Sequence, residues 1–174
     1  MINQPAESRL PLSSLIGQLV WNVKRGVGTF LTMEFGESHL SVREPIVPKA
    51  PVSPRNRKDL QRRKVFVVGD WHLWIQHADW KLKTVNGMLS SNYDIGTKRD
   101  EVLVDLSGQR LLSVDVVPAK NRWTLAFDLG GVLDIWPATY KAEELWGLHG
   151  WDGNIVGCRQ DGLYFRAKAG ARRT

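Results

Sequence analysis

The sequence contains a single cysteine, Cys158, among 174 residues. An internal disulfide needs two cysteines, and a zinc or iron–sulfur site built on thiolates needs several, so the sequence excludes both. This cysteine usage is typical of a reducing compartment. Arg159 follows Cys158 and could activate its thiol, but a lone cysteine is more often a small core residue.

Long hydrophobic runs are also missing. No segment offers the roughly 18 consecutive apolar residues of a membrane-spanning helix. Met1 to Leu19 lacks the positively charged start and continuous apolar stretch of a secretion signal. We therefore expect a cytoplasmic protein without a membrane span.

Motifs of catalysis and cofactor binding are absent as well. The sequence has no Gly-x-Ser-x-Gly nucleophile elbow. Gly26-Val27-Gly28 is followed by no βαβ helix, which indicates a hairpin turn and not a dinucleotide fingerprint. We expect a protein that is not an enzyme and that uses no cofactor.

Positive charge is concentrated in one segment. Between Pro48 and Lys64, seven lysines and arginines accompany one acid, Asp59, which gives a local charge of +6 and equals the net charge of the whole chain. Residues 166–173 add four more cations. The rest of the chain is mildly acidic, so the basic charge is peripheral and favours an acidic partner or nucleic acid.

Eight tryptophans are more than a chain of this size usually carries. Side chains alternate between the two faces of a strand, so Leu73 and Ile75 predict an outward Trp74, and Leu133 with Ile135 predicts an outward Trp136. Exposed tryptophan is a common interface anchor. The alternative is a second apolar layer, formed by the N-terminal segment or the proline-rich segment, that covers this face.

The order of apolar residues and turn glycines suggests an internal duplication. Three pairs of segments match in the same order: 17–23 with 108–114, 29–37 with 123–131, and 73–80 with 145–152. Leu40 and Val42, expected to face the core, match Leu133 and Ile135 in the same scheme. Any two β-meanders share period-two patterning, and this is the competing explanation.

These patterns predict a mainly β fold, either a sandwich or a partly open barrel of two pseudo-symmetric β-meander halves. We expect one globular domain that comprises an N-terminal leader (1–16), a first half (17–98), a second half (99–166) and a basic tail (167–174). Residues 45–64 form a proline-rich basic insertion in the first half, either a short helix or a loop.

Two histidine–acid pairs recur in the matched segments, His77 with Asp79 and His149 with Asp152. If symmetry brought them together, the cluster could hold a divalent metal or act in acid–base chemistry. Histidines in tryptophan-rich turns more often bond a backbone carbonyl, and the spacing matches no metal motif. His39 and His72 have no orienting acid nearby in sequence, so we interpret them as surface residues or as residues whose hydrogen bonds are satisfied within the fold.

The function that these features favour is binding of another protein through an acidic or apolar patch, as immunity proteins and accessory subunits of bacterial assemblies do. The predicted contacts are Trp74 and Trp136 as apolar anchors, with steering cations at Arg55, Arg57, Arg62 and Arg63. The alternatives are a nucleic-acid-binding accessory protein that uses the insertion and the tail, and a metal-dependent enzyme at the histidine–acid cluster. The same surfaces also allow a homodimer.

Overall fold

The computed structural model describes residues 11–48, 50–87, 89–93, 98–139 and 144–169. Within these ranges the chain is mainly β, as predicted, with two antiparallel sheets of six and five strands and few helices. The strands are β1 (Val20–Arg25), β2 (Leu31–Arg43), β3 (Lys64–Ile75), β4 (Ala78–Lys83), β5 (Leu89–Ser91), β6 (Leu111–Val117), β7 (Arg122–Phe127), β8 (Val132–Pro137), β9 (Glu144–Gly150), β10 (Asn154–Arg159) and β11 (Tyr164–Lys168). The helices are α1 (Pro54–Leu60), α2 (Lys98–Leu106) and the short 3-10 turns η1 (Pro11–Leu15) and η2 (Pro118–Lys120).

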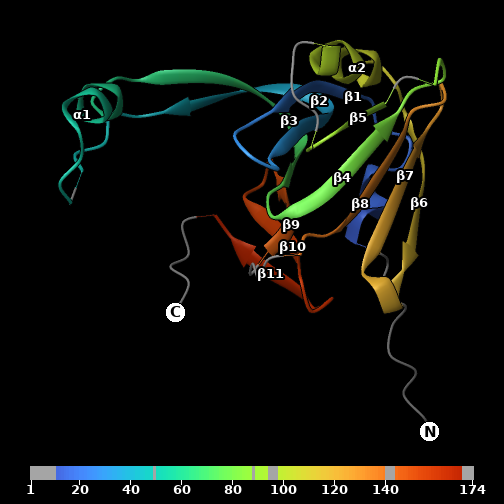
Figure 1. Cartoon of the computed structure of the whole chain (residues 1–174). Helices are drawn as coiled ribbons and strands as arrows, with labels where there is room; N and C mark the ends of the chain where they lie inside the picture. Colours follow the sequence, from blue (N-terminus) through green and yellow to red (C-terminus); the bar gives the residue numbers. More distant parts are fainter. Residues whose placement is uncertain (1–10, 49, 88, 94–97, 140–143, 170–174) are drawn as a thin grey trace, which may run out of the picture.

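The two halves of the chain exchange strands between the sheets. The meander β1-β2-β3 continues into β9-β10-β11, and the meander β6-β7-β8 continues into β4-β5. Each half therefore starts one sheet and completes the other. Figure 1 shows β4, from the first half, alongside β8 from the second.

Reciprocal hydrogen bonds join the starts of the two halves. The N–H of Gly17 donates to the Leu111 carbonyl, and the N–H of Gly108 donates to the Val20 carbonyl, both at 2.7 Å. Leu19 and Arg110 form an isolated antiparallel bridge between these contacts. Both glycines have positive φ, +85° and +90°, which other residues rarely adopt. The matched Gly-Gln pairs of the sequence thus occupy equivalent positions.

Strand pairing changes the correspondence elsewhere. Leu133 occupies the position in the β7–β8 pair that Leu73 occupies in the β2–β3 pair. The strand β8 therefore corresponds to the inner part of β3, and not to the segment of β2 that contains Leu40 and Val42. Trp80 lies opposite Ile135, and Trp146 lies opposite Ile75. The equivalent tryptophans are therefore Trp80 and Trp146, whereas segments 73–80 and 145–152 include hydrogen-bonded neighbours across β3 and β9.

The core lies between the sheets and contains three fully buried indoles, those of Trp80, Trp123 and Trp146. Trp123 and Trp146 meet edge to face, with ring centroids 5.0 Å apart, a favourable aromatic geometry. Two short helices close the ends of the core with buried side chains: Leu12 and Leu15 of η1, and Val102, Leu103 and Leu106 of α2. The second part of the predicted leader is thus core structure, and residues 1–10 lie outside the described residues.

The basic insertion forms the end of a projecting arm. We define the arm as residues 38–69, which comprise the outer parts of β2 and β3 and the segment that joins them. Figure 1 shows it extending away from the sheets, with α1 at its far end. Ser53 caps α1 by accepting the N–H of Asn56, and Pro54 begins the helix, as the Ser-Pro signal predicts.

Two glycines and one carboxylate determine the backbone geometry at the base of the arm. An extra residue in β2 shifts the register between Phe35 and Ser38. A Cβ on Gly36 would collide with Asp70, and one on Gly69 would collide with the Phe35 carbonyl. Asp70 accepts the Glu37 N–H at 2.8 Å and bonds the His39 ring at 2.7 Å.

The base of the arm is also attached to the turn after β9. The His39 ring stacks on Trp151, with centroids 4.6 Å apart, and the Trp151 N–H donates to the Asp70 carbonyl at 2.8 Å. The hydrogen bond from His39, followed by the one from the Glu37 N–H, lowers the pKa of Asp70 below its ordinary 3.8. A carboxyl with a lowered pKa stabilises the folded form above its ordinary pKa and loses that contribution as the pH falls through the lower, folded value.

We predict that Asp70→Asn loosens the arm without unfolding the sheets. Loss of a net hydrogen-bond contribution of about 1 kcal/mol at this partly exposed site should speed amide exchange in residues 38–43 about fivefold. Hydrogen exchange at pH 7 measures this. Asp152→Asn, in the neighbouring turn, is the control. Equal exchange in both variants would show that Asp70 does not anchor the arm.

Candidate functional site

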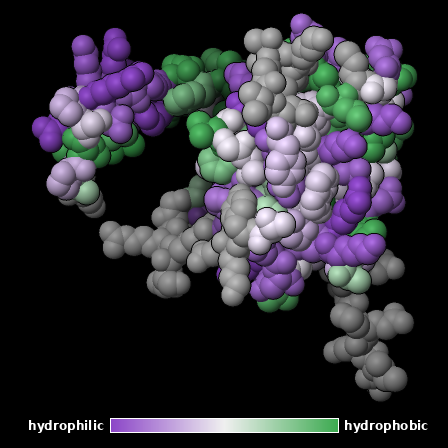
Figure 2. Space-filling view, in the orientation of Figure 1, coloured by the Kyte–Doolittle hydropathy of each residue, from purple (hydrophilic) through white to green (hydrophobic). Residues whose placement is uncertain are grey.

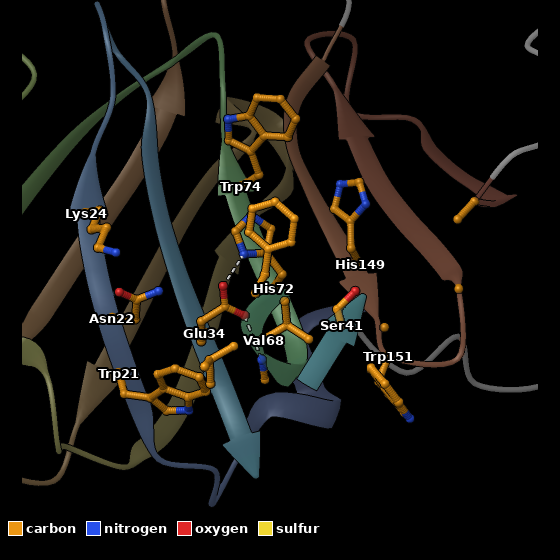
Figure 3. Close-up of a pocket in the computed structure, with 16 residues that line it drawn as sticks. Trp21, Asn22, Lys24, Glu34, Ser41, Val68, His72, Trp74, His149 and Trp151 are labelled. Atoms are coloured by element: carbon orange, nitrogen blue, oxygen red, sulfur yellow. Dashed lines mark hydrogen bonds and ion pairs between the residues drawn. The ribbon is translucent and has the colours of Figure 1, made fainter. Parts of the chain in front are cut away.

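A groove of about 1030 Å³ lies on the outer face of the six-stranded sheet. Its floor comes from β1, β2, β3 and β9, one wall from the arm, and the other from the turn after β9. Figure 3 shows His72, Trp74 and His149 near one another above the sheet, with Asn22 and Lys24 to one side. The groove therefore gathers residues from both halves of the chain.

A buried carboxylate lies under the centre of this groove. Glu34 is only 4% exposed. One of its oxygens bonds His72 Nδ1 at 2.7 Å, and the other accepts the N–H of Gly69 at 2.9 Å. Burial of a carboxylate costs several kcal/mol unless donors surround it. Here both oxygens have donors, and the imidazole is held in one orientation.

The bulge in β1 turns further polar groups toward the groove. The register of β1 shifts between Trp21 and Lys24, and Asn22 within it has φ of +53°. This is the left-handed region, which is uncommon for residues with a side chain. The Trp21 Nε1 donates to the Gly36 carbonyl at 3.0 Å, so the indole is fixed. Trp21, Asn22 and Lys24 all line the groove as a result.

Aromatic side chains surround the Glu34–His72 pair. The Trp74 ring lies 6.4 Å from that of His149 and meets Phe30 edge to face at 5.9 Å. The His149 ring is 6.1 Å from that of His72. Phe66 and Trp151 complete the aromatic lining.

The second sheet carries different side chains at the positions equivalent to those of the groove. Glu34 pairs with His72 across β2 and β3, and the matching pair across β7 and β8 is Ala126 with Val132. By the same pairing, Asp134 replaces Trp74 and Lys83 replaces His149. The fold therefore does not require the buried pair.

Trp74 and Trp136 both point away from the core, as alternation predicts, but they lie on different sheets. Arg122 stacks 5.6 Å above the Trp136 ring and bonds Asp134 at 2.9 Å. Trp136 is thus partly covered by its own chain. The two indoles therefore belong to separate surfaces.

The four predicted steering arginines are exposed at the far end of the arm, where Arg55 and Arg57 belong to α1 and Arg62 and Arg63 follow it. Arg63 bonds both oxygens of Glu44, at 3.0 and 2.9 Å. The hydrogen bond from Lys64, ahead of the attraction of Arg43, lowers the pKa of Asp59. The acids of the arm are thus engaged in ion pairs with its own cations, and the arginines dominate its charge.

The histidine–acid cluster, which the sequence analysis gave as an alternative, does not form among the described residues. Asp79 is buried and accepts from Asn92 and Tyr93, and Asp152 accepts from Asn154. The His77 ring contacts Phe30, while His149 lies in the groove. The described ranges contain no group of three or more His, Cys, Asp or Glu side chains that could hold a metal ion. Segments 73–80 and 145–152 are not equivalent by symmetry, so the symmetry of the fold does not bring the two histidine–acid pairs together.

The orienting acids of His39 and His72 were missed from the sequence. Asp70 and Glu34 approach them from neighbouring strands, 31 and 38 positions away. Only the strand register reveals such a pairing. The sequence did contain one indication of an outward acid on this strand, because Glu34 lies between the inward residues Met33 and Phe35.

Comparison with protein-family models, curated proteins and solved structures gives no match. In the part of the chain that the structure describes, no helix is both long and apolar enough to cross a bilayer.

A double-mutant cycle tests the coupling of Glu34 to His72. His72→Val alone leaves a buried carboxylate without its partner and should cost about 3 kcal/mol of the unfolding free energy. Glu34→Ala alone should cost about 2 kcal/mol. The double variant copies the Ala126–Val132 pair of the other sheet, so we expect it to lie within about 1 kcal/mol of wild type. Urea unfolding measures all four proteins, and additive losses would contradict the pairing.

Cys158 should be an inert thiol. Burial raises its pKa to about 11 from 9.0, so its thiolate fraction at pH 8 is about a hundredfold below that of an ordinary cysteine. We predict no reaction with Ellman's reagent in the folded protein and one equivalent after unfolding in guanidinium. Rapid reaction of the folded protein would show that the site opens.

Proposed function

We propose that the chain is a non-enzymatic binding protein whose arm holds another protein. The supporting observation is an uncovered apolar face on the arm. Leu40 lies opposite Val67, and Val42 lies opposite Val65. Residues two apart share a face of a strand, so these four aliphatic side chains form one continuous strip.

This strip is the extension of the core face. Val65 and Val67 share the parity of Leu73 and Ile75 in β3, which are fully buried between the sheets. The arm extends beyond the second sheet (Figure 1), so within the described ranges no other layer lies opposite the same face there. Leu40, Val42, Val65 and Val67 are 67, 53, 58 and 53% exposed. The prediction that Leu40 and Val42 face the core of this chain is wrong for this reason.

The charge of the arm defines the partner. Figure 2 shows hydrophobic side chains along the arm and hydrophilic ones gathered at its far end. The far end carries exposed Arg55, Arg57 and Arg62. A complementary surface has an apolar strip with acidic residues at one end, because apolar burial supplies the affinity and opposite charge supplies orientation and association rate. We propose such a protein as the partner.

A nucleic-acid ligand is the second candidate, and the basic helix is the observation that favours it. Phosphate contacts would use the arginines but would leave the aliphatic strip in water. Binding of that kind weakens steeply with salt. The strip therefore favours the protein partner.

The test is affinity capture from the source cells, followed by expression of the captured protein and measurement of its Kd. We expect Leu40→Ser with Val65→Ser to weaken binding at least tenfold, since about 1.5–3 kcal/mol is typical for burial of one aliphatic side chain. Leu112→Ser, at a similarly exposed leucine of β6, is the matched control and should leave Kd unchanged.

Salt and arginine variants separate the two candidates. Replacement of Arg55, Arg57 and Arg62 by alanine should mainly slow association, and the Kd of wild type should change little between 50 and 200 mM salt. If the serine variant binds normally and the complex is lost at higher salt, the arm binds a polyanion and the protein-partner proposal fails.

A further inference from the structure

We propose that the groove above the Glu34–His72 pair binds a small organic anion with a flat aromatic body, an aromatic carboxylate. This inference goes beyond the arm. The groove lies on the outer face of the sheet, whereas the aliphatic strip continues the core face. The two surfaces share Val67, but the other strip residues, Leu40, Val42 and Val65, do not line the groove, so the two sites have separate tests.

The charges in the groove select an anion. Its ionisable lining residues are Lys24, Glu34, His72 and His149. Both oxygens of Glu34 already accept hydrogen bonds, from His72 and from the Gly69 backbone. The carboxylate is buried below the imidazole, so a ligand meets the amine and the rings and not the negative charge. Cationic and donor groups stabilise a carboxylate through charge-assisted hydrogen bonds.

The rings in the groove select a flat apolar body. The four aromatic residues of its lining are Trp21, Phe66, Trp74 and Trp151. Trp21 is fixed by its bond to Gly36, Trp74 packs against Phe30, and Trp151 stacks on His39. Rings already held in place lose little entropy on binding. A volume of about 1030 Å³ lies at the upper end of the range of small-molecule pockets.

Two features of the groove cost stability and have no counterpart at the equivalent place in the second sheet. The buried Glu34–His72 pair is replaced by Ala126 and Val132 at the equivalent place in the second sheet. Asn22 adopts a left-handed backbone conformation that turns the β1 bulge toward the groove. Strained residues and bulges of this kind gather at binding sites. Strand β6 shifts register at the corresponding place, between Leu111 and Ser113, so the bulge itself is common to both sheets. The buried pair and the left-handed backbone of Asn22 occur on one sheet alone, and they point to a ligand and not to packing.

The test uses three compounds that share one ring system: 1-naphthoate, neutral 1-naphthylmethanol and cationic 1-naphthylmethylamine. Titration calorimetry measures their affinities for the full chain. We expect 1-naphthoate to bind at least tenfold more tightly than the other two. In NMR spectra the indole signals of Trp21, Trp74 and Trp151 should shift, while that of Trp136 on the opposite sheet should not.

The double variant Glu34→Ala, His72→Val removes the pair and keeps a combination that this fold already uses. It should fold, as its circular dichroism will show, and bind 1-naphthoate at least tenfold more weakly. Asp134→Asn, at the equivalent of Trp74, is the control and should bind as wild type does. A blocked peptide that contains Glu beside Trp tests a macromolecular source of the same chemistry.

Three outcomes would overturn the proposal. The first is equal affinity for the acid and the alcohol, which would show adsorption on apolar surface. The second is unchanged 1-naphthoate binding in the folded double variant. The third is binding of the peptide without binding of 1-naphthoate, which would make the groove a peptide site. The test of the arm changes Leu40 and Val65, neither of which lines the groove, so the failure of one proposal can be told from the failure of the other.

Discussion

The structure depends on the reciprocal main-chain hydrogen bonds that link Gly17–Val20 to Gly108–Leu111. They join the edge strand of one sheet to the edge strand of the other and orient the two meanders as near symmetry mates. In this orientation β4 reaches β8, and β9 reaches β3. Each meander alone would expose β3 or β8 as an open edge with a bare apolar face, which is unstable in water. The halves therefore fold as one unit, and any site built on β3 and β9 needs both.

Comparison of the two halves also distinguishes the positions that the fold requires from positions that it leaves free to vary. Core positions agree between the halves: Trp80 with Trp146, Leu73 with Leu133, Ile75 with Ile135. Outward positions differ, since the positions of Glu34 and His72 in the first sheet are occupied by Ala126 and Val132 in the second. The arm is a second departure, because β2 and β3 continue past the sandwich while β7 and β8 end with it. Both departures occur on the β2–β3 hairpin, so the two proposed binding surfaces are concentrated there.

Alternation along the sequence was sufficient to predict a mainly β fold and the outward Trp74, because strand geometry fixes side-chain direction locally. The register between distant strands was not predictable in this way. A period-two pattern looks the same after a shift of two residues, so the sequence matched Leu31 with Leu125, whereas strand pairing makes Met33 the equivalent of Leu125. Segments 73–80 and 145–152 seemed equivalent although they include neighbours across β3 and β9. For the same reason, the pairing of Glu34 with His72 and that of Asp70 with His39 could not be predicted from the sequence. Leu40 and Val42 followed the core pattern correctly, but the sequence could not show that the opposite sheet ends before it reaches them.

The arm and the groove share one group, the carboxylate of Glu34. One oxygen orients His72 at the centre of the groove, and the other binds the Gly69 N–H at the base of the arm. A two-stranded ribbon has little stability of its own in water, so its direction depends on contacts at the base. These are the Glu34–Gly69 bond, the Asp70 bonds to Glu37 and His39, and the stacking of His39 on Trp151. Trp151 also lines the groove. Glu34, Gly69 and Trp151 thus take part both in the lining of the groove and in the contacts that hold the arm.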